Sequence, residues 1–332
     1  MSTAQASRLR RSPELAALRA EPRRTERLVS IYVDTETHAL ADAGIALRLR
    51  RIGRRWVQTI KSRRTAGGAG LFSHDEIEQP APGGRLVLDG PDPTGVLAAI
   101  AEATGDAPLS PVFETRVERM VERLRLPDGG LVELALDRGE VVAGAARAPI
   151  LEAELELVEG GVASVFALAR LLFPAGPVRF AAANKAALGY RLAQTGAPPA
   201  DGPPRPRNAG ALDYAADATV ETVARDVFRD CFAQIAQNMV VVARTDAIEG
   251  PHQLRVGLRR LRTAFSIFGP TLGEAAVAPL STAARDLGRL VGALRDLDVL
   301  IDEVVGGPAS AGLDQPARAA LVAALDARRE AA

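Results

Sequence analysis

Charged residues alternate with aliphatic residues in several short segments of the first 160 residues. The basic members are Arg48, Arg50 and Lys61, and the acidic members are Glu76, Glu78, Glu154 and Glu156. Guanidinium groups hold phosphate oxygens well, and paired carboxylates are ligands that Mg²⁺ and Mn²⁺ prefer. Together these side chains could hold a complex of a divalent metal and a polyphosphate.

Such alternation also predicts how the residues are positioned. Successive side chains of a β-strand point to opposite faces, so each segment has one charged and one aliphatic face. For one strand alone, a sheet with a packed and a solvated face is the simpler interpretation. Here, however, positive and negative strands are segregated, and a sheet closed with its charges inward needs counter-ions in its lumen. This pattern favours an antiparallel sheet closed toward a barrel or tunnel.

Seven segments of the first part have period-two alternation or a β-rich composition, separated by turns such as residues 127–130. The predicted strands are residues 27–34, 44–51, 55–61, 74–78, 113–126, 130–137 and 150–158. The predicted helices between them are residues 13–20, 94–104, 164–172 and 184–195. This organisation is typical of an antiparallel sheet with flanking helices.

A proline- and glycine-rich segment at residues 196–211 predicts a semi-rigid linker between two domains, residues 1–195 and 212–332. The second domain is predicted to be helical over residues 212–243, 251–268, 273–294, 296–305 and 316–330. Pro251 fits the first helical position, and Gly269-Pro270 predicts the end of that helix. The fold class is therefore α+β: an N-terminal antiparallel β-barrel or tunnel with flanking helices, then an all-α helical bundle.

Composition limits the partners and the compartment. Lys+Arg and Asp+Glu both number 41 in 332 residues, so net charge favours no nucleic-acid partner. A single cysteine, Cys231, excludes an internal disulfide and fits a reducing cytoplasm. No apolar run approaches the roughly 18 residues of a membrane span, and no secretory signal pattern opens the chain. We expect a cytoplasmic protein with neither a membrane nor a specific nucleic-acid partner.

Several motifs of the first domain, in order, resemble the CYTH (triphosphate tunnel metalloenzyme) family. They are residues 32–35, 43–50, 56–61, 115–119, 134–140, 152–157 and 184–190. The resemblance covers about residues 25–195 and implies a tunnel that hydrolyses inorganic or organic triphosphates with a divalent metal. It implies phosphate ligands at Arg48, Arg50, Lys61, Arg119 and Lys185, of which Lys61, Arg119 and Lys185 are expected to be catalytic. It places metal ligands at Glu76, Glu78, Glu154 and Glu156, with Mg²⁺ or Mn²⁺ as cofactor.

This chain departs from the family pattern in two places. Members usually open with a strand reading Glu-x-Glu-x-Lys, whereas residues 1–10 contain no acidic side chain. The later lysine-helix motif usually carries an arginine where this chain has Leu188. We therefore expect either that the chain starts late and the first strand is missing, or that the domain binds phosphate without hydrolysing it.

A basic stripe marks the predicted helix 251–268. His252, Arg255, Arg259 and Arg262 recur at three- and four-residue steps. An apolar stripe follows the same rule about 120° away: Leu254, Leu258, Leu261, Phe265 and Phe268. The apolar stripe predicts core. The basic stripe is either a solvated face or a site for an anionic partner, while the spacing of the histidines argues against a histidine metal site.

Residues 252–262 resemble the signature of the CHAD domain, and residues 291–300 resemble its second motif. That family is an all-helical bundle that binds inorganic polyphosphate and commonly follows a CYTH domain. The resemblance implies polyphosphate binding by His252, Arg255, Arg259 and Arg262. Since the family usually has two helical halves, we expect only the first half before Ala332.

These features favour one function and leave alternatives open. The leading hypothesis is metal-dependent hydrolysis of inorganic triphosphate or polyphosphate, with a helical polyphosphate-binding module. The alternative is a non-catalytic polyphosphate-binding protein whose tunnel has lost its metal. Adenylate cyclase or thiamine-triphosphatase activity follows only from the breadth of the family, since no nucleobase- or thiamine-specific pocket is identified.

Overall fold

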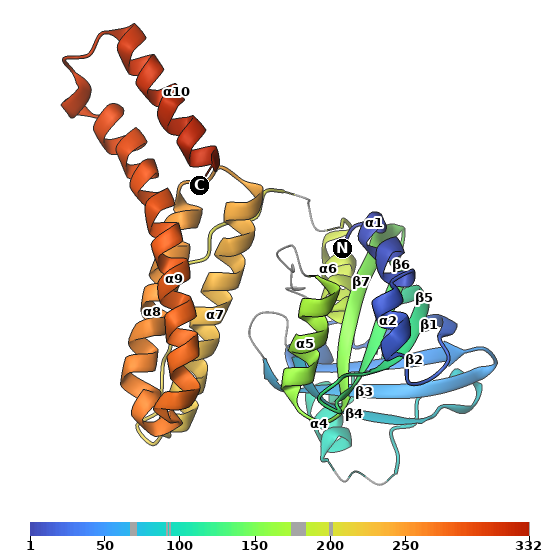
Figure 1. The fold of residues 1–332 in the computed structure, drawn as a ribbon. Coiled ribbons are helices and arrows are strands. Elements are labelled where there is room, and N and C mark those ends of the chain that lie inside the picture. Colours follow the sequence, from blue (N-terminus) through green and yellow to red (C-terminus); the bar gives the residue numbers. More distant parts are fainter. Residues whose placement is uncertain (67–71, 91, 93, 174–183, 199–201, 332) are drawn as a thin grey trace. The chain divides into compact units, whose positions relative to one another are not determined.

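The computed structural model describes residues 1–66, 72–90, 92, 94–173, 184–198 and 202–331, and these form two compact units (Figure 1). One unit comprises residues 1–66 and 72–200, and the other comprises residues 201–332. We call them the sheet domain and the helical domain. No helix among the described residues is long and apolar enough to cross a membrane.

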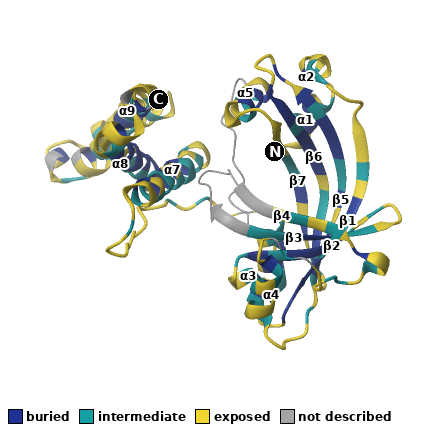
Figure 2. Cartoon of the chain, turned by 90° about the horizontal axis from the view of Figure 1, so that it is seen from below, coloured by how far each residue is buried: buried dark blue, intermediate teal, exposed yellow. Residues whose placement is uncertain are grey.

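The sheet domain is built on seven antiparallel strands in the order β4-β3-β2-β1-β5-β6-β7. They are β1 (Arg24–Asp34), β2 (Ile45–Ile52), β3 (Arg55–Ala66), β4 (Phe72–Pro80), β5 (Ser110–Arg125), β6 (Leu131–Ala143) and β7 (Ala146–Glu159). The predicted α+β class and the predicted antiparallel sheet are confirmed. In the pairing of the described strands, β4 and β7 are the two edges, so the sheet is not closed into a barrel. It curves strongly, and its two halves turn toward one another (Figure 2).

Strand register places the predicted charged positions on one face. Residues directly opposite one another across an antiparallel pair share a face. Lys61 is opposite Glu76, and Thr59 lies between Arg48 on one neighbouring strand and Glu78 on the other. On the other half, Asp137 is opposite Glu152, and Ala135 is opposite Glu154. We call this common surface the charged face.

Helices pack their apolar residues against the opposite, aliphatic face. Leu124, Leu134 and Leu168 belong to one buried cluster, which joins β5 and β6 to α2 (Pro13–Leu18) and α5 (Val162–Leu172). A second cluster joins β2 and β3 to α3 (Ala39–Asp42) and α4 (Val96–Thr104), and it includes Leu47 and Ile60. The short 3-10 helix η1 (Pro82–Gly84) follows β4. Burial of these leucines, at about 1.5–3 kcal/mol each, stabilises the aliphatic side.

One end of the charged face is filled by α6 (Lys185–Thr195). Tyr190 of this helix packs with Phe113 and Val141 of the sheet. Gly189 lets the helix approach closely, because a Cβ atom there would lie 2.0 Å from the Phe113 ring. The Tyr190 hydroxyl donates a 2.8 Å hydrogen bond to the buried carboxylate of Asp34. This packing sets the position of Lys185 at the first turn of α6.

The N-terminal residues form a helix that was not predicted, α1 (Thr3–Arg10). Ser2 and Gln5 make a reciprocal capping box at its start, so the local sequence carries a helix signal. Leu9 of α1 is buried in the cluster of β5, β6 and α5. None of the residues of α1 is acidic.

The helical domain contains α7 (Val220–Arg244), α8 (Glu249–Leu272), α9 (Glu274–Val299) and α10 (Gln315–Ala331), with a π-helical turn η2 (Leu300–Val305) and a 3-10 helix η3 (Pro308–Ser310). Its core joins α7, α8 and α9 through residues such as Cys231, Leu258 and Val291. The predicted apolar stripe of α8 is buried as expected, except that Phe268 is half-buried.

Four predicted helix boundaries were wrong. Residues 212–219 precede α7 rather than belonging to it. Helix α8 begins at Glu249, so Pro251 is its third residue, still in the first turn, where the missing N–H breaks no intrahelical bond. The helix also continues through Pro270 to Leu272, although a proline there removes one backbone hydrogen bond. The break predicted near residue 295 is absent from α9.

Part of the predicted linker is held on α7. The Asn238 amide bonds both backbone groups of Arg207, and Gln237 donates to the carbonyl of Arg205. The buried carboxylate of Asp230 accepts from the Arg207 side chain and from the backbone N–H of Gly210. Residues 205–210 therefore belong structurally to the helical domain, although they form no regular secondary structure.

Candidate metal and polyanion site

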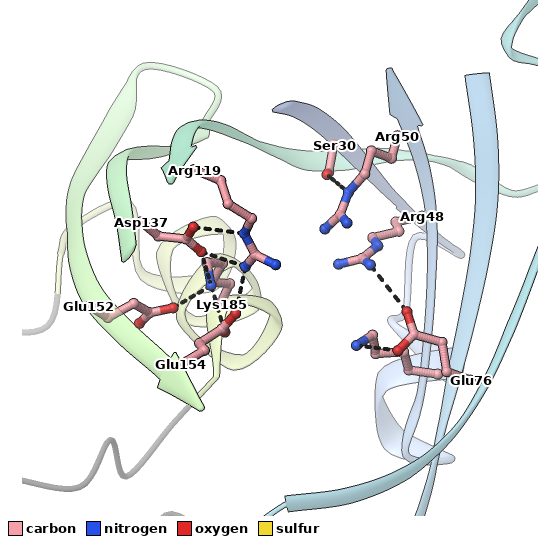
Figure 3. A network of polar contacts seen from close by, with 10 residues as sticks. Ser30, Arg48, Arg50, Glu76, Arg119, Asp137, Glu152, Glu154 and Lys185 are labelled. Atoms are coloured by element: carbon pink, nitrogen blue, oxygen red, sulfur yellow. Dashed lines mark hydrogen bonds and ion pairs between the residues drawn. The ribbon is translucent and has the colours of Figure 1, made fainter. Parts of the chain in front are cut away.

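Three carboxylates from β6 and β7 meet on the charged face (Figure 3). Asp137, Glu152 and Glu154 each offer an oxygen, and these oxygens all lie within 4.8 Å of one another. We call these three residues the acidic triad. The Lys185 Nζ lies 2.7 Å from Asp137 Oδ2 and 2.7 Å from Glu154 Oε1, and it also contacts Glu152 Oε1. One ammonium therefore bridges all three carboxylates.

Arg119 of β5 joins the triad from the other side. Its Nε and Nη2 bind Asp137 Oδ1 and Oδ2 at 2.8 and 2.6 Å in a bidentate arrangement, and Nη2 also binds Glu154. Burial by itself lowers the pKa of Arg119, but these hydrogen bonds and charges raise it above its ordinary value. Since Asp137 is buried, this bidentate fork is a charge-assisted pair that is largely shielded from solvent.

The pKa values of the two glutamates of the triad are shifted in opposite directions. Loss of solvent alone would raise the pKa of Glu154, but the charges of Lys185 and Arg119 and their hydrogen bonds lower it to about 2. For Glu152, burial raises the pKa, and the contact with Lys185 offsets only part of this effect. The pKa of Lys185 is raised by the three carboxylates despite the opposing effect of burial. Within the triad, Glu154 is thus held anionic by the two cations Lys185 and Arg119.

The other half of the charged face carries Arg48 and Arg50 of β2 and Lys61 of β3, which we call the basic wall. Lys61 Nζ lies 2.7 Å from Glu76 Oε2, and Arg48 Nη2 lies 3.4 Å from Glu76 Oε1. The two guanidinium groups point toward the side of Arg119 (Figure 3). Only 9% of the Arg48 side chain is exposed, and its buried Nε has no hydrogen-bond partner among the described residues.

Arg50 is the least compensated cation of the wall. Its only side-chain partner in the part of the chain that the structure describes is the neutral Ser30 hydroxyl, at 3.1 Å from Nε. Burial, followed by the charge of neighbouring Arg48, lowers the pKa of Arg50 to about 10. A half-buried guanidinium beside another guanidinium, without a carboxylate in direct contact, is an unfavourable arrangement that an anionic ligand would relieve.

The predicted metal ligands do not form one group. Glu154 is in the triad, whereas Glu76 and Glu78 lie on β4, where Glu78 accepts a 3.1 Å hydrogen bond from Thr59. Glu156 is exposed on β7, opposite Glu133. The assignment of Glu76, Glu78 and Glu156 to a metal stays a prediction.

Alternation along β6 and β7 places Asp137 and Glu152 on the charged face, but the sequence did not select them as site residues. Alternation identifies the face of each strand. It does not identify the register that brings Asp137 opposite Glu152, nor the long-range contact of both with Lys185. The five predicted phosphate ligands, in contrast, all lie on the charged face: Arg48, Arg50, Lys61, Arg119 and Lys185.

On α8, the predicted basic stripe is accessible. Arg255, Arg259 and Arg262 are exposed and His252 is half-buried. Arg255 pairs at 3.4 Å with Asp296 of α9, an acid of the second predicted motif. The adjacent Arg260 is not part of the stripe, because it turns inward to Asp230 and Gln234.

Comparisons with known proteins agree with both resemblances. The CYTH domain family matches residues 1–190, and the CHAD domain family matches residues 226–332. An inorganic triphosphatase of Haemophilus influenzae is 29% identical over 168 residues, which are 50% of this chain and 46% of that protein. The chain therefore spans less than half of the length of this curated relative.

Solved structures give weaker likenesses, each 18% identical. A Hippeastrum protein described as a candidate adenylyl cyclase with dominant triphosphatase activity has a TM-score of 0.38, covering 59% of this chain and 92% of its own. A candidate adenylate cyclase of Bacillus halodurans has a TM-score of 0.37, covering 56% and 90%. The PH1819 protein of Pyrococcus horikoshii has a TM-score of 0.32, covering 54% and 90%.

Proposed function

The chain belongs to the CYTH domain family, and we propose on that premise that its sheet domain hydrolyses inorganic triphosphate or polyphosphate with Mg²⁺ or Mn²⁺. The observation that carries the proposal is the pair Arg48 and Arg50, which points across the charged face toward the acidic triad. Glu76 is the one carboxylate that contacts this pair among the described residues, and it contacts only Arg48. A polyanion between the two would pair the guanidinium groups, and a divalent metal would pair the carboxylates. The inorganic triphosphatase from Haemophilus influenzae supports the choice of substrate.

The donor set of the triad fits a hard divalent cation. All three members offer carboxylate oxygens, which Mg²⁺ and Mn²⁺ prefer to nitrogen or sulfur, and these oxygens lie close enough together to approach one ion. When bound, the metal would neutralise charge on the phosphoryl oxygens and activate the attacking water. We assign Asp137, Glu152 and Glu154 to this role.

The basic residues hold and orient the phosphate chain. Arg48, Arg50 and Lys61 bind oxygens from one side, and Arg119 and Lys185 bind them from the other. Phosphoryl transfer needs little covalent help from the protein, so positioning and charge neutralisation account for most of the rate enhancement. The guanidinium groups are already held by strands, which keeps the entropic cost of ordering them low. The curved sheet would enclose the bound chain as a tunnel.

Phosphate release from tripolyphosphate tests this function. We expect metal-dependent release by the wild-type protein, and a loss of at least tenfold in Glu154→Gln and Lys61→Ala. Arg51→Ala is a matched control, because Arg51 is exposed on the neighbouring position of β2 and lies 5.9 Å from the Trp56 ring. Wild-type release equal to that of a protein-free blank, with either metal, would contradict hydrolysis.

One observation favours the second candidate, a polyphosphate-binding protein without turnover. Residues 3–10 form the helix α1 without an acidic side chain, where the family usually has an acidic strand. If this candidate is correct, tripolyphosphate should bind with micromolar or better affinity while no phosphate is released. Binding that disappears in Arg50→Met would then assign the charged face to storage or sensing.

For the helical domain we propose polyphosphate binding by the basic stripe of α8: His252, Arg255, Arg259 and Arg262. Long-chain polyphosphate should bind less tightly as salt rises, because its phosphates release counter-ions. Arg255→Ala/Arg259→Ala should weaken binding by at least tenfold and flatten the salt dependence. Equal affinity of this variant and the wild type would exclude the stripe.

A further inference from the structure

Lysine is used at only two positions of this chain. Of the 41 lysine and arginine residues, only Lys61 and Lys185 are lysines. Both lie on the charged face, and each contacts carboxylates there. Arginine supplies all the other positive charges of this set. The two lysines lie at the two places where they contact acidic groups of the charged face: Lys61 at Glu76, and Lys185 at the acidic triad.

Lys185 makes the more saturated contact. An ammonium group has three N–H donors, and Lys185 directs contacts to Asp137, Glu152 and Glu154, one carboxylate for each donor. Only 11% of the side chain is exposed. Its backbone is fixed at the start of α6, where Asn184 caps the helix through a 2.9 Å bond to the N–H of Ala187.

A divalent metal would need the same oxygens. Lys185 contacts one oxygen of each triad member, and the triad is where the proposed function assigns the metal. The two cations are alternatives, because an ammonium in the middle of three carboxylates and a divalent ion at the same oxygens would repel each other. Arg119 is different, since its fork makes a bidentate pair with Asp137 and contacts only one other member of the triad, Glu154.

We propose that Lys185 is an exchangeable occupant of the metal site: it holds the acidic triad together until a divalent metal displaces it, and it then turns to the phosphate chain. This inference rests on the proposed metal site. A compact ammonium on a flexible stem can make this exchange, whereas the planar fork of an arginine is less suited to it. Metal and polyanion would consequently bind with positive coupling, because each metal bound releases one cation for the anion.

A titration with Mn²⁺ alone tests the exchange without any turnover. Free Mn²⁺ is measured by electron paramagnetic resonance in the absence of phosphate, for the wild type, Lys185→Met, Lys185→Arg and Lys61→Met. Lys185→Met should bind Mn²⁺ roughly tenfold more tightly or better, because the competing charge is gone. Lys61→Met is the matched control: its pair with Glu76 is on the basic wall, so the affinity should change by less than about threefold after screening. Lys185→Arg keeps the competing charge, so it should bind Mn²⁺ no more tightly than the wild type.

The outcomes separate the inference from the proposed function. Unchanged or weaker Mn²⁺ binding by folded Lys185→Met, with Mn²⁺ still bound by the wild type, overturns the exchange alone. Tightening in Lys61→Met instead of Lys185→Met also overturns it and moves the metal to Glu76. A wild-type protein that binds no Mn²⁺ overturns the metal site and the proposed hydrolysis with it.

A second measurement does not depend on whether Lys185→Met folds. Because the chain has two lysines, acetylation of the wild type followed by mass spectrometry reports on each separately. Mg²⁺ should increase acetylation of Lys185 several-fold, since the metal releases it from the triad, and should leave Lys61 unchanged. Slower or unchanged acetylation of Lys185 at a Mg²⁺ concentration that saturates the protein would overturn the exchange.

Discussion

Replacement of Arg50 by methionine should stabilise the ligand-free protein and weaken its binding of polyphosphate. The side chain has only the Ser30 hydroxyl as a partner among the described residues, and it lies beside another arginine. Methionine has a similar length and no charge, so Arg50→Met removes the unfavourable buried charge while largely keeping the volume. Opposite effects on stability and binding would identify Arg50 as a ligand-binding residue rather than a structural one.

The magnitude follows from the pKa. The lowering of the pKa of Arg50 from its ordinary value to about 10 corresponds to about 3 kcal/mol by which the folded state disfavours the charged form. Arginine remains charged at neutral pH, so this cost is present in full below pH 10. Loss of the Ser30 hydrogen bond takes back about 1 kcal/mol. We expect the free energy of unfolding to rise by about 1–3 kcal/mol, and binding of a non-hydrolysable tripolyphosphate analogue to weaken by tenfold or more, from the loss of one charge-assisted hydrogen bond.

Fluorescence of the single tryptophan gives the assay. Trp56 lies on β3 opposite Arg51, so urea unfolding followed at this residue reports on the sheet domain rather than on the helical domain. The titration is carried out in phosphate-free buffer, and the analogue is titrated separately by calorimetry. Arg51→Met serves as the control, with an expected loss of stability of at most about 1 kcal/mol from its contact with the Trp56 ring and no change in binding.

Destabilisation of the ligand-free protein by more than about 1 kcal/mol in Arg50→Met would refute the reasoning, because it would make Arg50 a structural cation with partners that compensate its burial. Unchanged binding of the analogue would refute it as well, even if stability rose.

Three further changes have expected outcomes. Arg119→Met should destabilise the sheet domain by about 3 kcal/mol, because buried Asp137 loses its bidentate partner; a stabilised variant in the same urea assay would contradict this. Tyr190→Phe should cost about 1.5–3 kcal/mol at neutral pH through the lost bond to Asp34. Burial and Asp34 raise the folded-state pKa of Tyr190 above 10.0, so the wild type loses this stability advantage as the pH rises past 10. A difference in the free energy of unfolding between wild type and variant that does not narrow above pH 10 would contradict this. Asp230→Asn should release residues 205–210 from α7 and speed their cleavage by trypsin at least tenfold, which mass spectrometry of the fragments detects; equal rates would argue against the attachment.

Period-two alternation was enough to predict the charged face. The parity of Arg48, Glu76 and Glu154 assigns each side chain to a face without knowledge of the fold, because the geometry of a strand is local. The same local rule assigned the apolar stripe of α8 to the core. These predictions hold because a shift of one residue would bury charges and expose leucines along a whole strand.

The composition of the triad was beyond local patterns. Asp137, Glu152 and Lys185 come from β6, β7 and α6, and only register and helix packing decide that their charged atoms meet. The predictions of the helix ends were wrong for a related reason. Pro251 is a strong local signal, but it lies in the first turn of α8, where its missing N–H breaks no intrahelical bond, and α8 also continues past Pro270. The proline- and glycine-rich composition of residues 205–210 likewise gave no sign of their hydrogen bonds to α7.

Some charged side chains of the charged face have partners of opposite charge and others do not, and this unequal pairing argues for a ligand rather than for a structural ion network. A fold selected for stability alone would pair its buried cations, as Arg119 is paired with Asp137, or replace them with apolar residues. On the basic wall Arg50 has a serine in place of a carboxylate, and the Nε of Arg48 has no partner among the described residues. The triad has the reverse arrangement, with three carboxylates and two cations. A negative ligand is therefore favoured at one half of the face and a positive one at the other, which is the charge pattern of a phosphate chain bound together with a metal.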